Sequence, residues 1–169
     1  DYPNQKFVLF PAGAERKARQ MSINSMVWEI SHILADCDPT IYLYGSSALN
    51  DFRLGWSDID ILVLTDKQIS ESQANLLVNL RQTMLANEPD NPYYHSFEGG
   101  MLTISAFLAN ADDRVVYWGT SGEQITDRYL LDSFCKAELI ENSILLYGKD
   151  IRKELKYPDF HELYADVNR

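Results

Sequence analysis

The sequence predicts an α/β (α+β) fold in which helices flank a mixed β-sheet. Short β-branched and aromatic runs alternate with long segments whose apolar residues recur at helical spacing. One strand-like run, residues 58–65, is apolar on both faces from Asp60 onwards, which is typical of a central strand covered on both sides. The 169 residues are 46% hydrophobic, enough for one domain with its own core. We therefore expect a single domain over 1–169, with an N-terminal arm over 1–13 and a C-terminal tail over 150–169.

Each expected element rests on a local pattern. On the first helix, apolar residues recur at i, i+3, i+4 and i+7 from Ile23. Ser70, followed three residues later by Gln73, is the signature of a capping box. The short link before residues 114–118 favours a strand antiparallel to its neighbour. In order, we expect a strand or packed arm over 7–10, a helix over 14–37, a strand over 41–44, a short helix over 45–49, a strand over 58–65, a helix over 70–86, strands over 101–108 and 114–118, a helix capped at 126–127 and ended by 147–148, and a short helix after 158.

The composition excludes several classes of partner. The net charge is −10, and residues 36–113 hold three basic against twelve acidic residues. Such a surface repels a nucleic-acid backbone and attracts metal ions or polycationic small molecules, although a general solubility charge is an equal alternative. No apolar run is long enough to cross a bilayer, so we expect no membrane partner. Cys37 and Cys135 lack zinc-ligand spacing, which favours a reducing cytoplasm.

A candidate phosphate cradle follows the strand at 41–44, which ends in Gly45 and Ser46 and turns at once into a helix. Backbone N–H groups at a helix start attract phosphate. Gly45 lets the backbone approach a ligand closely, and Ser46 adds a hydroxyl. Taken alone, this pair is better explained as a plain turn.

A candidate metal site follows after eleven intervening residues, at Asp58 and Asp60. Side chains at i and i+2 of a strand share one face, about 7 Å apart at the backbone. Oxygen ligands in this arrangement suit hard divalent cations, and two carboxylates repel each other unless a cation lies between them. The alternative, two exposed acids at a strand end, is disfavoured by the apolar strand and the upstream Gly-Ser turn.

Together, Tyr44-Gly-Ser, the eleven-residue spacing and Asp58-Ile-Asp-Ile-Leu-Val resemble the motif of the nucleotidyltransferase superfamily that includes DNA polymerase β. The residues of these motifs are most similar to those of the aminoglycoside adenylyltransferase branch. Residues 135–149 are similar to a later helix of that branch and the glycine that closes it. The resemblance covers roughly 40–155 and implies a nucleotidyltransferase core.

The resemblance implies in-line transfer of a nucleoside monophosphate from ATP or another nucleoside triphosphate, with pyrophosphate leaving. Gly45, Ser46 and Ser47 would hold the triphosphate. From its position beside the site, Arg53 is a candidate phosphate contact, with a solvated surface residue as the alternative. The two aspartates would bind Mg²⁺ in a two-metal site that bridges the phosphates. Both aspartates therefore count as catalytic residues as well as metal ligands.

Two features depart from the family pattern. The family normally carries a third carboxylate on a later strand, but the strand expected over 101–108 has no acid. Glu98 lies just before that strand and is our candidate general base, with an exposed loop glutamate as the alternative. The family usually also has a C-terminal helical domain over the acceptor. Because this chain ends at Arg169, we expect a fragment, a homodimer or partner protein that completes the acceptor site, or a protein acceptor.

Three functional hypotheses follow. The first is transfer of AMP from ATP to a hydroxyl of a small cationic acceptor such as an aminoglycoside, which would confer antibiotic resistance. The second keeps the chemistry but adenylylates a partner protein, as in antitoxin-type nucleotidyltransferases. The third is a non-catalytic nucleotide-binding module, motivated by the missing strand carboxylate.

Overall fold

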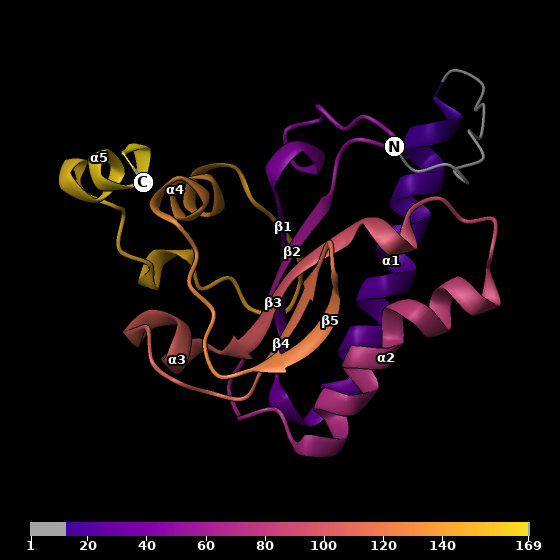
Figure 1. Ribbon diagram of the computed structural model, residues 1–169, viewed down its shortest axis with the longest axis horizontal. Helices are drawn as coiled ribbons and strands as arrows, with labels where there is room; N and C mark the ends of the chain where they lie inside the picture. The colour runs from indigo at the N-terminus through magenta and orange to yellow at the C-terminus, as the bar shows by residue number, and fades with distance from the viewer. Residues whose placement is uncertain (1–12, 169) are drawn as a thin grey trace.

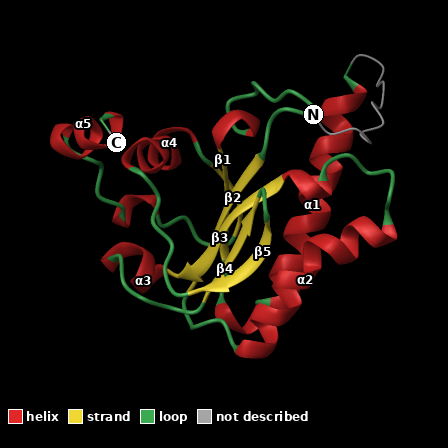
Figure 2. Ribbon diagram, viewed as in Figure 1, coloured by secondary structure: helices red, strands yellow, loops and turns green. Residues whose placement is uncertain are grey.

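The computed structural model describes residues 13–168, so the strand or arm expected over 7–10 lies outside the described residues. Within that range, one six-stranded mixed sheet has helices on both faces, as the sequence predicted (Figures 1 and 2). The main elements are α1 (Ala14–Ile33), β1 (Thr40–Tyr44), β2 (Ile59–Thr65), α2 (Glu71–Asn87), β3 (Phe97–Thr103), α3 (Ile104–Ala109), β4 (Val115–Gly119), β5 (Gly122–Thr126), α4 (Ser133–Asn142), β6 (Ile144–Tyr147) and α5 (Phe160–Val167). No helix in this part of the chain is long and apolar enough to cross a membrane.

The sheet has the strand order β5-β4-β3-β2-β1-β6. Only β2 and β3 pair in parallel, with α2 as the crossover between them, and the other neighbours are antiparallel. In this register Tyr44 of β1 lies opposite Asp60 of β2, and Asp60 lies opposite Glu98 of β3. The topology therefore brings three segments together at one end of the central strands.

Alternation along β2 divides the core into two layers. Ile61 and Val63 belong to the cluster packed against α1 and α2, whereas Leu62 and Leu64 belong to the cluster on the side of α3 and α4. Figure 1 shows these two pairs of helices on opposite faces of the sheet. Asp60 and Leu62 are two residues apart on β2, so their side chains lie on the same face of the sheet. The Asp60 carboxylate therefore lies on the α4 side.

The strand expected over 101–108 was wrong at both ends. β3 begins at Phe97, and residues 104–109 form α3. Thr103 stops the strand because its side chain accepts a hydrogen bond from the Ala106 N–H at 3.2 Å and caps α3. The Asp113 carboxylate in turn accepts hydrogen bonds from the backbone N–H and the hydroxyl of Thr103, at 2.8 and 2.9 Å.

The helix expected to start at 126–127 was also misplaced. Asp132, not Asp127, caps α4, and its carboxylate accepts a hydrogen bond from the Cys135 N–H at 2.8 Å. Ile144 begins the edge strand β6, so the helical run ends earlier than expected. β5 was not expected at all, because its residues are half-buried or exposed and only one, Ile125, is strongly apolar.

The remaining elements follow the sequence patterns closely. Ser70 and Gln73 form both hydrogen bonds of the expected capping box at the start of α2. The first helix ends at Ile33, and a short 3₁₀ turn carries the chain to Cys37. The segment after Gly45 is a 3₁₀ turn over Gly45–Ser47, shorter than the helix expected over 45–49.

Candidate active site

Three carboxylates converge at the end of the central strands where β2 begins. Asp60 and Glu98 are register partners on the parallel strands, and Asp58 lies two residues before Asp60. One oxygen from each of the three side chains lies within 4.8 Å of the others. Glu98 is therefore the second residue of β3, not a loop residue before the strand. The missing strand carboxylate in the sequence was a consequence of the misplaced strand boundary.

Among the residues that the structure describes, this cluster has no positively charged ion-pair partner. None of the ion pairs within residues 13–168 involves any of the three side chains. Burial first, and then the charges of Asp58 and Glu98, raise the pKa of Asp60 to about 6. Burial and the neighbouring Glu98 also raise the pKa of Asp58. Such a site favours protons or a divalent cation, either of which offsets the mutual repulsion.

The Gly-Ser turn lies directly against this cluster. Gly45 has a φ of +73°, and a Cβ at this position would lie 2.5 Å from Asp60 Oδ2. Only a glycine allows the turn and the carboxylate to approach so closely. Two residues on, Ser47 Oγ is buried and has no hydrogen-bond partner among the described residues. An unsatisfied buried hydroxyl next to a glycine turn suits a bound ligand with acceptor oxygens.

Replacing Gly45 with Ala is expected to damage the site with only a moderate effect on the fold. The new methyl group would displace Asp60, and the positive φ would add strain of about 1 kcal/mol. Turnover should fall by roughly a hundredfold because two binding elements move apart. Nucleotide-dependent turnover and thermal unfolding of G45A, with Gly13→Ala as a control at a positive φ far from steric contact, measure this. Wild-type turnover in G45A would contradict the close packing.

The other sequence candidates lie at the border of the site. Ser46 is half-buried in the same 3₁₀ turn as Gly45. Arg53 is exposed in the loop that leads to β2, and its backbone N–H donates to Ser57 Oγ at 2.9 Å. The sequence candidates thus divide into a close group around Asp60 and an exposed arginine on the connecting loop.

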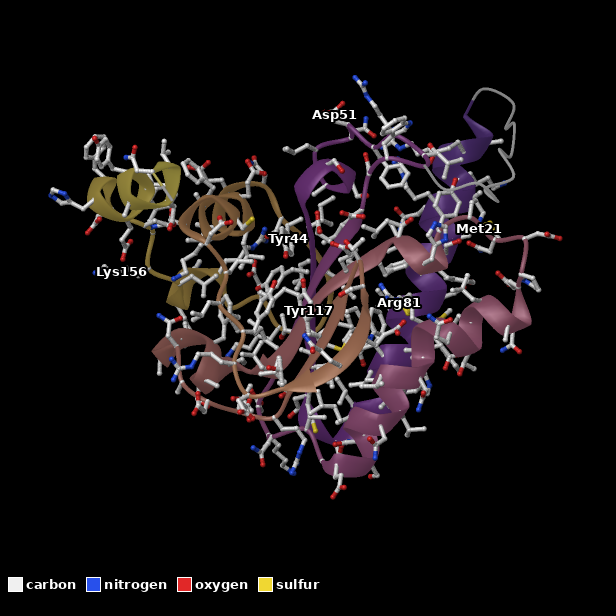
Figure 3. The ribbon with its side chains drawn as sticks, in the orientation of Figure 1. Met21, Tyr44, Asp51, Arg81, Tyr117 and Lys156 are labelled. Atoms are coloured by element: carbon white, nitrogen blue, oxygen red, sulfur yellow. The ribbon has the colours of Figure 1, made fainter. Side chains whose placement is uncertain are left out.

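Sequence reasoning did not bring together a group of tyrosines that lies beside the carboxylates. The hydroxyls of Tyr44 and Tyr129 lie 3.4 Å apart, and the rings of Tyr117 and Tyr129 are 6.1 Å apart at their centroids. A Cβ on Gly100 would lie 2.7 Å from the Tyr129 ring, so this ring packs flush on β3 two residues after Glu98. Figure 3 labels Tyr44 and Tyr117 in this region. Tyrosines scattered over 85 residues of sequence gave no local signal.

A second omission is Thr120, in the turn between β4 and β5. Its hydroxyl donates a hydrogen bond to Glu98 Oε1 at 2.7 Å. Twenty-two residues separate the two side chains. No pattern in the sequence links a polar turn residue to this glutamate.

Comparison with known proteins agrees with this geometry. The sequence model of a family described as "Nucleotidyltransferase domain" matches residues 26–95, which include the Gly-Ser turn and both aspartates. Over this segment the chain is similar to nucleotidyltransferase domains. The matched segment ends before Glu98, whose place in the cluster comes from the strand register.

The fold comparison points the same way. A crystal structure of spectinomycin adenyltransferase AAD(9) from Enterococcus faecialis with ATP and spectinomycin is similar, with a TM-score of 0.66 at 15% sequence identity. The match covers 88% of this chain and 64% of that chain, so the present chain spans less than two thirds of the solved structure that it matches. A search of curated protein sequences found no match.

Proposed function

We propose that the protein transfers AMP from ATP to a hydroxyl group of a small, cationic acceptor such as an aminoglycoside, in a metal-dependent reaction. The observation that carries this proposal is the approach of three carboxylates to within 4.8 Å of one another beside the Gly45 turn. The resemblance of the motif to the aminoglycoside adenylyltransferase branch, and the fold shared with a spectinomycin adenyltransferase, support the choice of this branch.

The residues present fit Mg²⁺. All three donors are hard carboxylate oxygens, burial and mutual repulsion raise the pKa of Asp60 and of Asp58, and no described cation neutralises them. Asp58 and Asp60 would bind one or two Mg²⁺ ions. When bound, Mg²⁺ would offset the charge of the triphosphate and of the leaving pyrophosphate.

The chain's own residues would then bind and orient the reactants. Gly45, Ser46 and Ser47 present backbone and hydroxyl groups to the triphosphate, and the buried, unpaired Ser47 Oγ gains a partner. Arg53, exposed on the adjacent loop, would contact a phosphate. The acceptor oxygen attacks the α-phosphorus while the bond from that phosphorus to the bridging oxygen breaks, and pyrophosphate leaves. Glu98 accepts the proton of the acceptor hydroxyl.

The acceptor class follows from charge. Residues 36–113 hold most of the net charge of −10, which disfavours nucleic acid and favours a cationic molecule. The Tyr117 ring lies against Gly119, the residue before Thr120, and adds an apolar face there. We propose that a second subunit, either another copy or a partner protein, completes the acceptor site. Cys37 and Cys135 are both unpaired, which supports the proposed reducing cytoplasm.

A direct test is pyrophosphate release with ATP and Mg²⁺ over a panel of aminoglycosides and lincosamides. We expect release that depends on one acceptor, together with mass spectrometry showing AMP attached to it. Binding of ATP–Mg²⁺ without release over the whole panel would instead indicate a non-catalytic module. Transfer of labelled AMP to protein in place of a small molecule would indicate the protein-adenylylating class.

A further inference from the structure

The backbone pairing between β3 and β4 ends next to Glu98, the third carboxylate of the site. Backbone pairing of the two strands runs from Met101 opposite Val116 to Gly99 opposite Trp118, and stops there. Continued in register, Glu98 would face Gly119. Carbonyl groups at such an opening lose their ladder partners and need other donors.

A buried arginine supplies those donors. Arg81, on α2, is only 4% exposed, and its guanidinium donates to the Phe97 carbonyl at 2.7 Å and to the Gly119 carbonyl at 3.0 Å. Its Nε donates to Glu123 Oε1 at 2.7 Å, which balances the charge. Figure 3 labels Arg81 between α2 and the sheet. The planar fork of arginine donors suits this bridging of two strands, which a lysine could not reproduce.

The two carbonyls that Arg81 holds belong to the residues that immediately precede Glu98 and Thr120. Arg81 thereby fixes the backbone on both sides of the hydrogen bond from Thr120 Oγ1 to Glu98 Oε1, which measures 2.7 Å. A hydrogen bond to a charged acceptor is short and directional, so it restricts the glutamate to one orientation. Because Thr120 holds Glu98 Oε1, the direction in which the whole carboxylate faces is set by this hydrogen bond.

We propose that Thr120 is a positioning residue that orients Glu98 toward the acceptor hydroxyl, in a setting held by Arg81. This inference rests on the proposed function, because it assigns Thr120 a part in the same transfer step. Thr120 touches neither nucleotide nor acceptor in this proposal. Its effect on the reaction passes entirely through Glu98.

The test compares Thr120→Val, which keeps the shape but removes the donor, with Thr120→Ser, which keeps the hydroxyl. We expect T120V to lower kcat about tenfold, with the KM for ATP unchanged within about twofold, and T120S to stay within about twofold of wild type. Because Thr120 is exposed, both variants should fold, which thermal unfolding checks. Ser121→Ala, the next residue in the turn, is the matched control and should leave kcat unchanged.

A double variant shows whether T120V lowers kcat through Glu98 or through a general effect on the protein. In the Glu98→Gln background, T120V should add no further loss of kcat, because the charged partner is already gone. An equal loss in both backgrounds, or an unchanged kcat in T120V alone, would overturn the proposal.

Crystal structures give a readout that does not depend on activity. In wild type and T120S, a Glu98 oxygen should stay within 4.8 Å of the aspartate oxygens, whereas in T120V the side chain should turn away. If wild type releases no pyrophosphate with any acceptor, the proposed function fails, while these structures still decide whether Thr120 orients Glu98. Glu98 in its original place in T120V would overturn the inference by itself.

Discussion

Replacing Asp60 with Asn is expected to lower kcat by roughly a thousandfold, because the neutral amide is a poor ligand for a divalent cation and no longer offsets its charge. Asp58→Asn should have an effect of similar size. Pyrophosphate release at saturating ATP and Mg²⁺ measures both. Asp66→Asn, at the far end of β2, is a matched control that should remain within about twofold of wild type. Full activity in both D58N and D60N would show that the carboxylates do not hold the metal.

The same substitution should stabilise the metal-free protein in a pH-dependent way. Burial and the charges of Asp58 and Glu98 raise the pKa of Asp60 from the ordinary 3.8 to about 6. Between these values the folded state binds more protons than the unfolded state, so the Asp60 contribution is fully present below pH 4 and is lost as the pH rises to 6. The D60N variant has no titrating carboxyl group at residue 60, so it does not undergo this loss of stability.

The free energy of unfolding of D60N relative to wild type should therefore grow from pH 4 to pH 6 and then level off, reaching about 3 kcal/mol. Thermal and urea unfolding in a chelator at pH 4, 5, 6 and 7.5 measures this difference. The comparison with wild type isolates Asp60 from other carboxylates such as Asp113, whose pKa is lowered. A difference that is equal at pH 4 and pH 7.5 would contradict the raised pKa.

Replacing Glu98 with Gln is expected to reduce turnover by about a hundredfold to ten-thousandfold, because the amide cannot accept the proton of the acceptor hydroxyl. Affinity for ATP should change by no more than about threefold, since the nucleotide is held by the Gly45 turn. Stopped-flow turnover and calorimetric ATP binding separate these effects. Glu71→Gln, an exposed glutamate on α2, is the control.

Unchanged turnover in E98Q would exclude Glu98 as the base, even if Asp58 and Asp60 prove essential. A parallel loss of ATP affinity would instead indicate that Glu98 acts mainly on metal or nucleotide. The two variants, D60N and E98Q, therefore distinguish a missing metal from a missing proton acceptor.

The turn and the aspartate pair could be found in the sequence because their spacing is short and local. Gly45 to Asp60 spans one antiparallel pair of strands, and the alternation of Asp58 and Asp60 fixes their shared face without any long-range information. The same holds for the capping box at Ser70, where both partners lie within four residues.

The start of β3 could not be found in this way. Glu98 is followed by Gly99 and Gly100, a pair that favours a turn in isolation. In the structure both glycines are dictated by packing, since a Cβ on Gly99 would lie 1.8 Å from the Ile61 carbonyl oxygen and one on Gly100 would meet the Tyr129 ring. The contacts that explain these glycines come from segments distant in sequence.

The C-terminal elements show a different limit. The run from Ile140 to Ile144 is compatible with either a helix or a strand by periodicity alone. Its division at Ser143 depends on Ile144 pairing with Leu43 of β1 at the sheet edge. The hydrogen bond between Thr120 and Glu98 likewise exists only once β3, β4 and β5 are assembled.

The parallel pairing of β2 with β3 has a consequence for the order of assembly. Asp60 and Glu98 meet only after the whole α2 crossover has folded, because parallel strands cannot be joined by a local hairpin. At neutral pH their repulsion opposes this late step. A cation bound at Asp58 and Asp60, beside Glu98, would offset this repulsion, so its loss would destabilise the pairing of the two central strands before that of the edge strands.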